Sequence, residues 1–244
     1  MKPVFSVAIL SWKSPLTLRN TLASYKENGL LDLTDDVTIF FQEMSEADIA
    51  IAEQFDIQSI GSTENIGIGA AITKLVKNAK HEYVLFLEND WELVEPADVV
   101  RDQIEMGVCI LSNGLADVVK MRSRFKYGDP LYTLQFMNRE QDCPEHMGDM
   151  VHWKKDPNLD FPDVIVRAHG INYGGREVCY FIQSKHCSQT NNPCLHTKKF
   201  YLEHIAPFSG QGDELEGKIR EYWQSHNFTI AHSRGLFKHE RLDR

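Results

Sequence analysis

Acidic residues follow a short apolar run in the first half of the chain. Residues 83–87 are apolar, and Glu88, Asn89 and Asp90 come directly after them. A run of this length is typical of a buried strand. In open α/β sheets, ligands bind beyond the carboxyl ends of the strands, and Mg²⁺ is often held by one or two carboxylates with substrate phosphates. The spacing therefore predicts a divalent cation on Glu88 and Asp90; the alternative is a solvated strand end without a ligand.

A glycine-rich segment at residues 65–71 is the second candidate. Gly67 and Gly69 open an expected helix, whose first N–H groups could bind an anion. The alternative is that these small residues only allow the helix to pack closely on the sheet. A dinucleotide fingerprint is disfavoured, because it needs glycine or alanine where Ile72 stands and it normally follows the first strand.

Alternating strands and helices are expected to position both candidates. Proline at residue 15 follows Ser14 at an expected helix start, and Asn28-Gly29 is typical of its end. The expected strands are residues 4–11, 36–41, 57–60 and 83–87, and the expected helices are residues 15–28, 47–55 and 68–80. This βαβαβαβ order predicts an α/β domain with a mostly parallel central sheet flanked by helices.

Three segments in this order resemble the GT-A fold glycosyltransferases, most closely the inverting family 2 enzymes. Residues 6–12 resemble that family's first strand, residues 65–70 its Asn-x-Gly segment, and residues 85–90 its strand ending in Asp-x-Asp, with Glu88 where aspartate is usual. The resemblance implies a single GT-A-like domain. Residues 1–95 would form the nucleotide-sugar-binding half, and residues 96–244 would form the acceptor-side half with a C-terminal tail.

The resemblance also implies roles for individual residues. A metal, Mn²⁺ or Mg²⁺, would be held by Asp90, by Glu88 and by His239, which lies in a segment resembling the family's C-terminal tail. A histidine near a chain end is also often only solvated. The positions that would bind the donor are Ser11, Trp12, Gln42, Glu43, Asn65, Gly67 and Asn89.

Two C-terminal segments resemble the acceptor side of the same family. Residues 189–200 resemble the lining of the acceptor pocket, and residues 210–216 resemble the acidic helix start that carries the catalytic base. The resemblance thus implies that Asp213 or Glu214 deprotonates the acceptor hydroxyl. Acids in a first helical turn are also favoured by the helix dipole, so an ordinary helix start is the alternative.

Together these features predict an enzyme of glycan biosynthesis, a hexosyl- or pentosyltransferase. It would move a sugar, with inversion, from a nucleotide diphosphate sugar to a glycan, glycoconjugate or protein-linked acceptor. A sugar-1-phosphate nucleotidyltransferase is a second hypothesis, although residues 11–15 lack its usual glycine-rich, arginine-containing loop. A non-catalytic nucleotide- or carbohydrate-binding module of the same fold is a third.

Composition limits the partners. The 244 residues carry 26 basic and 35 acidic side chains, a net charge of −9, which disfavours nucleic acid. The basic residues 120–126 are the exception, and they are expected either to meet a diphosphate or to form a solvated edge strand. No long apolar run and no signal peptide is evident, and the 5 cysteines are an odd number, so we expect a soluble cytoplasmic protein without a membrane span.

Residues 126–185 are rich in proline and glycine, with scattered aromatic residues and histidines. They predict an irregular acceptor-side region. Aromatic faces there would suit a sugar acceptor, and the alternative is a loop cover that packs on the sheet through its own aromatics.

Overall fold

The computed structural model describes residues 4–129, 134–135, 144–152, 154–168, 179–210 and 215–243. Its N-terminal part alternates strands and helices as expected from the sequence. These elements are β1 (Phe5–Ser11), α1 (Pro15–Glu27), β2 (Val37–Phe41), α2 (Glu46–Gln54), β3 (Gln58–Gly61), α3 (Ile68–Asn78) and β4 (Tyr83–Glu88). Each begins and ends within two residues of its predicted bounds, because proline, glycine and helix-capping residues mark the ends clearly.

The second part of the chain contributes the remaining elements. The helices are α4 (Ala97–Ser112), the short α5 (Pro157–Asp160), α6 (Lys198–Phe200) and α7 (Leu215–Ser225), with a 3₁₀ segment η2 (Pro144–His152). The strands are β5 (Trp91–Leu93), β6 (Val118–Arg122), β7 (Ile165–Arg167), β8 (Tyr180–Gln183), β9 (Cys194–Thr197) and β10 (Thr229–His239). Of the expected irregular region, residues 130–133, 136–143, 153 and 169–178 lie outside the described residues.

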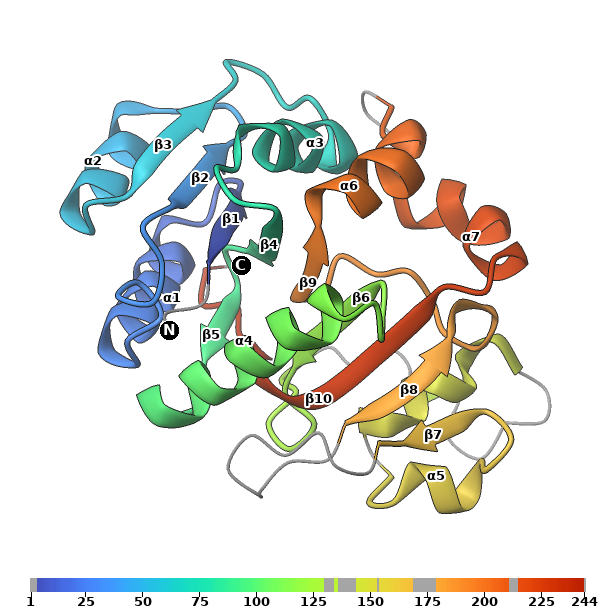
Figure 1. Ribbon diagram of the computed structural model, residues 1–244. Coiled ribbons are helices and arrows are strands. Elements are labelled where there is room, and N and C mark those ends of the chain that lie inside the picture. The colour runs from blue at the N-terminus through green and yellow to red at the C-terminus, as the bar shows by residue number, and fades with distance from the viewer. Residues whose placement is uncertain are drawn as a thin grey trace.

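One sheet joins both parts of the chain. Its order is β3-β2-β1-β4-β9-β6-β10-β8-β7, and β5 pairs with β10 outside this order. The strands from β3 to β4 are parallel, β6 and β10 are also parallel, and the other pairings are antiparallel. The sheet is therefore mixed, and the predicted α/β fold is confirmed (Figure 1).

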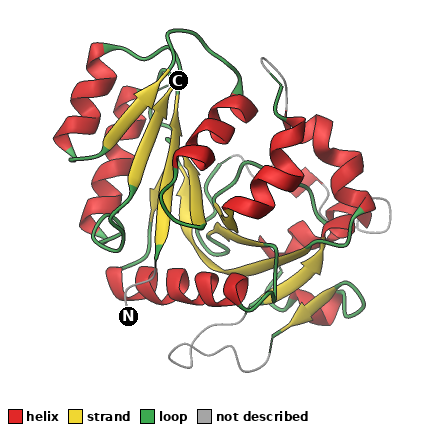
Figure 2. Cartoon of the chain, turned by 45° about the horizontal axis from the view of Figure 1, so that its top comes forward, coloured by secondary structure: helices red, strands yellow, loops and turns green. Residues whose placement is uncertain are grey.

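Helices cover both faces of this sheet, as Figure 2 shows. Alternate strand residues point to opposite faces, so Val7 and Ile9 join the core under α1, α2 and α4, whereas Ala8 and Leu10 join the core under α3 and α7. A strand buried on both faces has no polar face to show. This explains the continuous apolar runs in β1 and β4.

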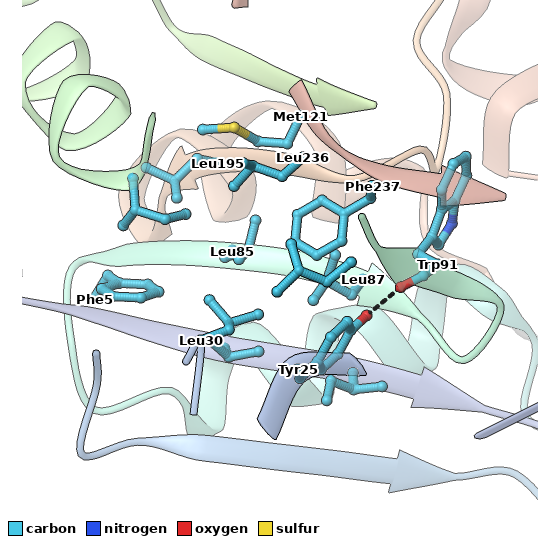
Figure 3. Packing of buried hydrophobic residues seen from close by; sticks show 14 of the residues in the cluster. Phe5, Tyr25, Leu30, Leu85, Leu87, Trp91, Met121, Leu195, Leu236 and Phe237 are labelled. Carbon is cyan, nitrogen blue, oxygen red and sulfur yellow. Dashed lines mark hydrogen bonds between the residues drawn. The ribbon is translucent and has the colours of Figure 1, made fainter. Parts of the chain in front are cut away.

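The segment expected to be a C-terminal tail is instead the end of a strand inside the sheet. Strand β10 lies between β6 and β8, and Leu236 and Phe237 are fully buried. Figure 3 shows Phe237 beside Leu87 of β4 and Tyr25 of α1. The hydroxyl of Tyr25 donates a hydrogen bond to the carbonyl oxygen of Trp91 at 2.8 Å. Removing the chain after Gly235 would thus take away core residues, at roughly 3–5 kcal/mol for a phenylalanine alone.

The basic cluster does not form an edge strand, so that expectation is wrong. Strand β6 lies between β9 and β10, and both Lys120 and Arg122 are buried. The Lys120 ammonium donates to the carbonyl and the hydroxyl oxygens of Thr190, each at 3.1 Å, and Arg122 donates to the Tyr127 carbonyl at 3.0 Å. Since none of these side chains lines the cavity described below, the cluster holds loops in place.

Candidate functional site

A cavity of about 720 Å³ opens at the carboxyl ends of β1, β2 and β4. This is the edge of the sheet where the sequence predicts a ligand. Its lining comes from segments far apart in the chain: Leu10, Trp12, Gln42, Asn65, Gly67, Ile68, Glu88, Asn89, Asp90, Asn191, Asn192, Leu215, Glu216 and Arg241.

The charges on this lining are unbalanced. Glu88, Asp90 and Glu216 are acidic, whereas Arg241 is the single Lys or Arg among the lining residues that the structure describes. One carboxylate oxygen of Asp90 and the amide nitrogen of Asn89 are buried without a hydrogen-bond partner. Buried polar atoms of native proteins nearly always have a partner, and these two belong to residues that line the cavity, where a ligand could contact them.

Asp90 lies against His239 at the end of β10. Nε2 of His239 is 3.2 Å from the other carboxylate oxygen of Asp90, and Nδ1 donates to the backbone carbonyl of Asp129. That carbonyl fixes the ring so that Nε2 faces the carboxylate. Burial lowers the pKa of His239, but the hydrogen bond and charge of Asp90, together with the Asp129 carbonyl, outweigh burial and raise it overall.

Glu88 ends β4 on the same side of the sheet. Burial and the negative charges of Asp90 and Glu216 raise the pKa of its carboxyl to about 8. The carboxyl therefore keeps its proton at neutral pH as long as no cation compensates the neighbouring charges.

The segment that leads into α3 is held by Gln42. The Gln42 side chain accepts from the Ile66 N–H at 3.0 Å and donates to the Gly67 carbonyl at 3.1 Å, while Asn65 accepts from the Gly67 N–H at 2.9 Å. Gly67 has a φ of 85°, a conformation that favours glycine. Gln42 thus lines the cavity, but both ends of its amide shape the loop.

Trp12 and Glu43 stand together at the cavity mouth. The indole N–H of Trp12 donates to Glu43 at 3.2 Å, and the Lys13 ammonium lies 2.6 Å from the same carboxylate. Lys13 and Glu43 both have positive φ, at 48° and 52°. Trp12 is 44% exposed, and the Lys13 ammonium lies over its ring, 5.2 Å from the centroid.

The predicted residues thus fall into three groups. Trp12, Gln42, Asn65, Gly67, Glu88, Asn89 and Asp90 line the cavity. Ser11, Glu43 and His239 adjoin it without lining it: Ser11 accepts from the Gln42 N–H at 3.0 Å, Glu43 holds Trp12, and His239 contacts Asp90. Asp213 and Glu214 lie outside the described residues.

Two charged lining residues were not predicted. Glu216, in the first turn of α7, accepts from the Asn191 N–H at 2.7 Å and so holds the loop before β9. Arg241 follows β10 and donates to the Ser14 hydroxyl at 3.0 Å. Glu216 belongs to the acidic run that suggested a catalytic base, whereas Arg241 shares no local pattern with the rest of the site.

Asp90 and His239 suit a divalent cation. A carboxylate oxygen and an imidazole nitrogen face each other, and the second carboxylate oxygen of Asp90 is unpartnered. Within the described ranges, no group of three or more His, Cys, Asp and Glu side chains is arranged to hold a metal. A cation here would take its other ligands from water and a bound phosphate, as Mg²⁺ often does.

Comparison with solved structures identifies the fold. S. aureus TarS 1-349 in complex with UDP aligns with a TM-score of 0.58 at 13% identity, covering 98% of this chain and 60% of that one. A second TarS 1-349 structure gives a TM-score of 0.57 at 10% identity, with 96% and 60% covered. The chain has the fold of TarS. It spans only 60% of the length of these two TarS chains.

Two further matches are weaker. A mycobacterial protein aligns with a TM-score of 0.51 at 13% identity, covering 98% of this chain and 68% of that one. The mannosyltransferase PcManGT from Pyrobaculum calidifontis, in complex with GDP-Man and Mn²⁺, aligns with a TM-score of 0.39 at 12% identity, over 48% of this chain and 35% of that one, which is too little to support an argument. No family model matches the sequence, and a search of curated proteins finds no match. In the described part of the chain, no helix has both the length and the apolar character needed to cross a bilayer.

Proposed function

We propose that this protein is an inverting glycosyltransferase that uses a nucleotide diphosphate sugar and a divalent cation. The observation that carries the proposal is the contact between Asp90 and His239, with an unpartnered oxygen of Asp90 in an acid-lined cavity. TarS has the same fold and was solved with UDP, which supports a nucleotide diphosphate as the ligand class. The resemblance of residues 65–70 and 85–90 to the GT-A enzymes supports the same class.

The charge of the cavity explains why a cation belongs to the proposal. A diphosphate is an anion, and the carboxylates of Asp90 and Glu216 line the space that it would enter, beside the protonated Glu88 and against one arginine. Like charges at short range in a poorly hydrated cavity repel strongly. A divalent cation held by Asp90 and His239 would compensate these charges, so that the acids would favour binding of the diphosphate instead of opposing it.

Each residue then has a defined role. Asp90 and His239 would hold the cation, Glu88 would bind it directly or through water, and Trp12, Asn65, Gly67 and Asn89 would border the donor. When bound, the cation supplies Lewis-acid stabilisation of the charge that develops on the leaving diphosphate. Asp213 or Glu214 would accept the proton of the acceptor hydroxyl.

The direct test is turnover with a panel of nucleotide sugars and Mn²⁺. Without an acceptor, water can replace it, so we expect slow release of a nucleoside diphosphate from one donor in the panel. Proton NMR of the released sugar, recorded before its anomers equilibrate, should show inversion. Pyrophosphate release from a nucleotide triphosphate and a sugar 1-phosphate would instead indicate a nucleotidyltransferase, and tight binding without turnover a binding module.

The base assignment has its own test. General base catalysis contributes about 10²–10⁴-fold, so either Asp213→Asn or Glu214→Gln should lower turnover with acceptor by that factor while donor affinity stays unchanged. Glu216→Gln is the matched control. Glu216 also lines the cavity, but its carboxylate already accepts a hydrogen bond from the Asn191 N–H. If neither of the first two variants loses turnover, the assignment is wrong.

A further inference from the structure

The residues that follow β10 cross from the sheet to the start of α1. Residues 240–243, here called the C-terminal strap, begin where the Glu240 N–H donates to the Asp90 carbonyl at 2.8 Å. They end where Asp243 meets the first turn of α1. In Figure 2 the C-terminal end of the chain lies near the carboxyl ends of the first strands. The strap therefore spans the edge of the sheet on which the cavity opens.

Asp243 does for α1 what a local cap residue normally does. Ser14 precedes the helix, but its side chain makes no capping hydrogen bond. Instead the Leu16 and Thr17 N–H groups donate to the Asp243 carboxylate at 2.9 and 3.2 Å. These are among the donors that an N-cap side chain usually satisfies, and a negative charge is favoured at this end of a helix.

Thr17 closes the contact from the helix side. Its hydroxyl donates to the Asp243 carboxylate and accepts from the Leu242 N–H at 2.9 Å. The Thr17 side chain is buried, so the strap is fixed to a rigid part of the fold.

The position of Ser14 completes the arrangement. Its hydroxyl, which is free of the capping role, accepts from Arg241 at 3.0 Å. Arg241 is thus held from two sides, by Ser14 directly and by Asp243 two residues further along. It remains exposed and lines the cavity as the one Lys or Arg among the described lining residues.

We propose that the C-terminal strap is a positioning device, in which Asp243 and Thr17 hold Arg241 where it binds the diphosphate of the donor. This inference rests on the proposed function. It adds Arg241 as a residue that binds the diphosphate, and Asp243 and Thr17 as residues that act by positioning Arg241. A guanidinium suits this task because it stays charged and presents several donors in a fixed plane. The remaining N–H groups of Arg241 can still meet phosphate oxygens while one donates to Ser14.

The experiment measures affinity for UDP and for inorganic pyrophosphate, each with Mn²⁺, by titration calorimetry. Arg241→Gln should weaken both by about tenfold or more, because a hydrogen bond to a charged group is lost. Asp243→Asn and Thr17→Val should weaken both by a smaller factor, since Arg241 remains but is less well held. Asp243→Glu and Thr17→Ser should recover most of the affinity.

A double variant separates positioning from a general loss of stability. If Asp243 acts through Arg241, then Arg241→Gln with Asp243→Asn should bind no more weakly than Arg241→Gln alone. Asp48→Asn is the matched control, because Asp48 supports the start of α2 in a capping box and does not line the cavity. It should lower the melting temperature to a similar extent and leave both affinities unchanged.

Two results would overturn the inference, and only the second would also overturn the proposed function. If the wild-type protein binds UDP with Mn²⁺ and Asp243→Asn or Arg241→Gln binds it equally well, the strap has no such role although the proposed function stands. If the wild-type protein binds neither UDP, GDP nor pyrophosphate with Mn²⁺, the proposed function and the inference fail together.

Discussion

Two acid-lined hollows lie at opposite ends of β2. The first is the cavity at the carboxyl ends of β1, β2 and β4, and the second, of about 520 Å³, lies near the amino ends of β2 and β3, with Asp32, Asp35, Asp36 and Asp56 in its lining. At the second hollow, Asp35 pairs with Lys80 and with His81, and Asp36 accepts from the Lys80 N–H at 2.8 Å. Neither Asp35 nor Asp36 there is left with a buried oxygen that lacks a partner.

The pKa values of the two regions move in opposite directions. Hydrogen bonds from Lys80 and His81 lower the pKa of Asp35 to about 2, whereas burial and like charges raise that of Glu88 to about 8. A lowered value means that the protein already supplies the positive partners of the acid. The raised value of Glu88 means that burial and the neighbouring acids outweigh the positive charge of Arg241, and the cation proposed above would compensate them. Clustered acids therefore indicate a ligand site only where the protein leaves them uncompensated.

The largest expected effect is at Asp90. Asp90→Asn should abolish metal-dependent binding of UDP, because it removes the negative charge of the carboxylate. One oxygen of this carboxylate faces His239, and the other has no hydrogen-bond partner. The melting temperature should change by no more than a few degrees, since the side chain fills no core volume. Calorimetric titration with UDP and Mn²⁺ measures the first quantity, and a thermal melt measures the second.

Asp35→Asn is the matched control at the other hollow and should bind UDP and Mn²⁺ like the wild type. Equal losses in the two variants would break the distinction between the hollows.

His239→Gln should come next, with metal-dependent affinity lowered by about tenfold to a hundredfold, the range found when a group that supports a metal site is removed. The loss should shrink in titrations with UDP alone, because the imidazole would touch the cation and not the nucleotide. An identical loss with and without Mn²⁺ would contradict a role for His239 that acts through the cation.

Glu88→Gln should raise the melting temperature of the metal-free protein by several degrees at pH 8. Because the folded pKa is raised from 4.5 to about 8, the folded protein keeps a proton that the unfolded chain loses. Stability therefore falls as the pH rises from 4.5 through 8, and glutamine removes this dependence. The gain over wild type should be small at pH 4.5 and should grow towards pH 8; a constant difference would mean that Glu88 is ionised throughout.

The smallest effect is expected for Asp35, which is exposed and whose ion pairs are screened by solvent. Its folded pKa of about 2 lies below the ordinary 3.8, so its contribution is present above pH 3.8 and is lost as the pH falls towards 2. Asp35→Asn should make the melting temperature slightly less sensitive to pH in that interval. A larger pH dependence in the variant would contradict the pairing with Lys80 and His81.

The sequence predicts well what local patterns determine. The strands and helices from β1 to β4 match because each has its own apolar run and end signals, and the same runs place Asp90, Asn65 and Gly67 at one edge of the sheet. Gln42 also lies there, but a sequence cannot reveal that its amide group is hydrogen-bonded to the backbone of Ile66 and Gly67.

Long-range pairings are what the sequence does not reveal. The segment that includes His239 was expected to be a C-terminal tail, yet it belongs to β10, which pairs with β6, β8 and β5. The basic residues of β6 suggested an edge, but loops cover Lys120 and Arg122. Arg241 and Asp243 reach the site only because β10 ends beside Asp90, which no local pattern encodes.

Anomalous diffraction from crystals grown with Mn²⁺ and UDP tests the central claim most directly, because it locates the cation without reference to activity. The expected result is one strong manganese peak between the Asp90 carboxylate and Nε2 of His239, within about 2.0–2.4 Å of both, with the diphosphate completing its ligands. A peak at the hollow beside Asp35 and Asp36, or UDP bound in the cavity with no manganese at Asp90, would contradict it.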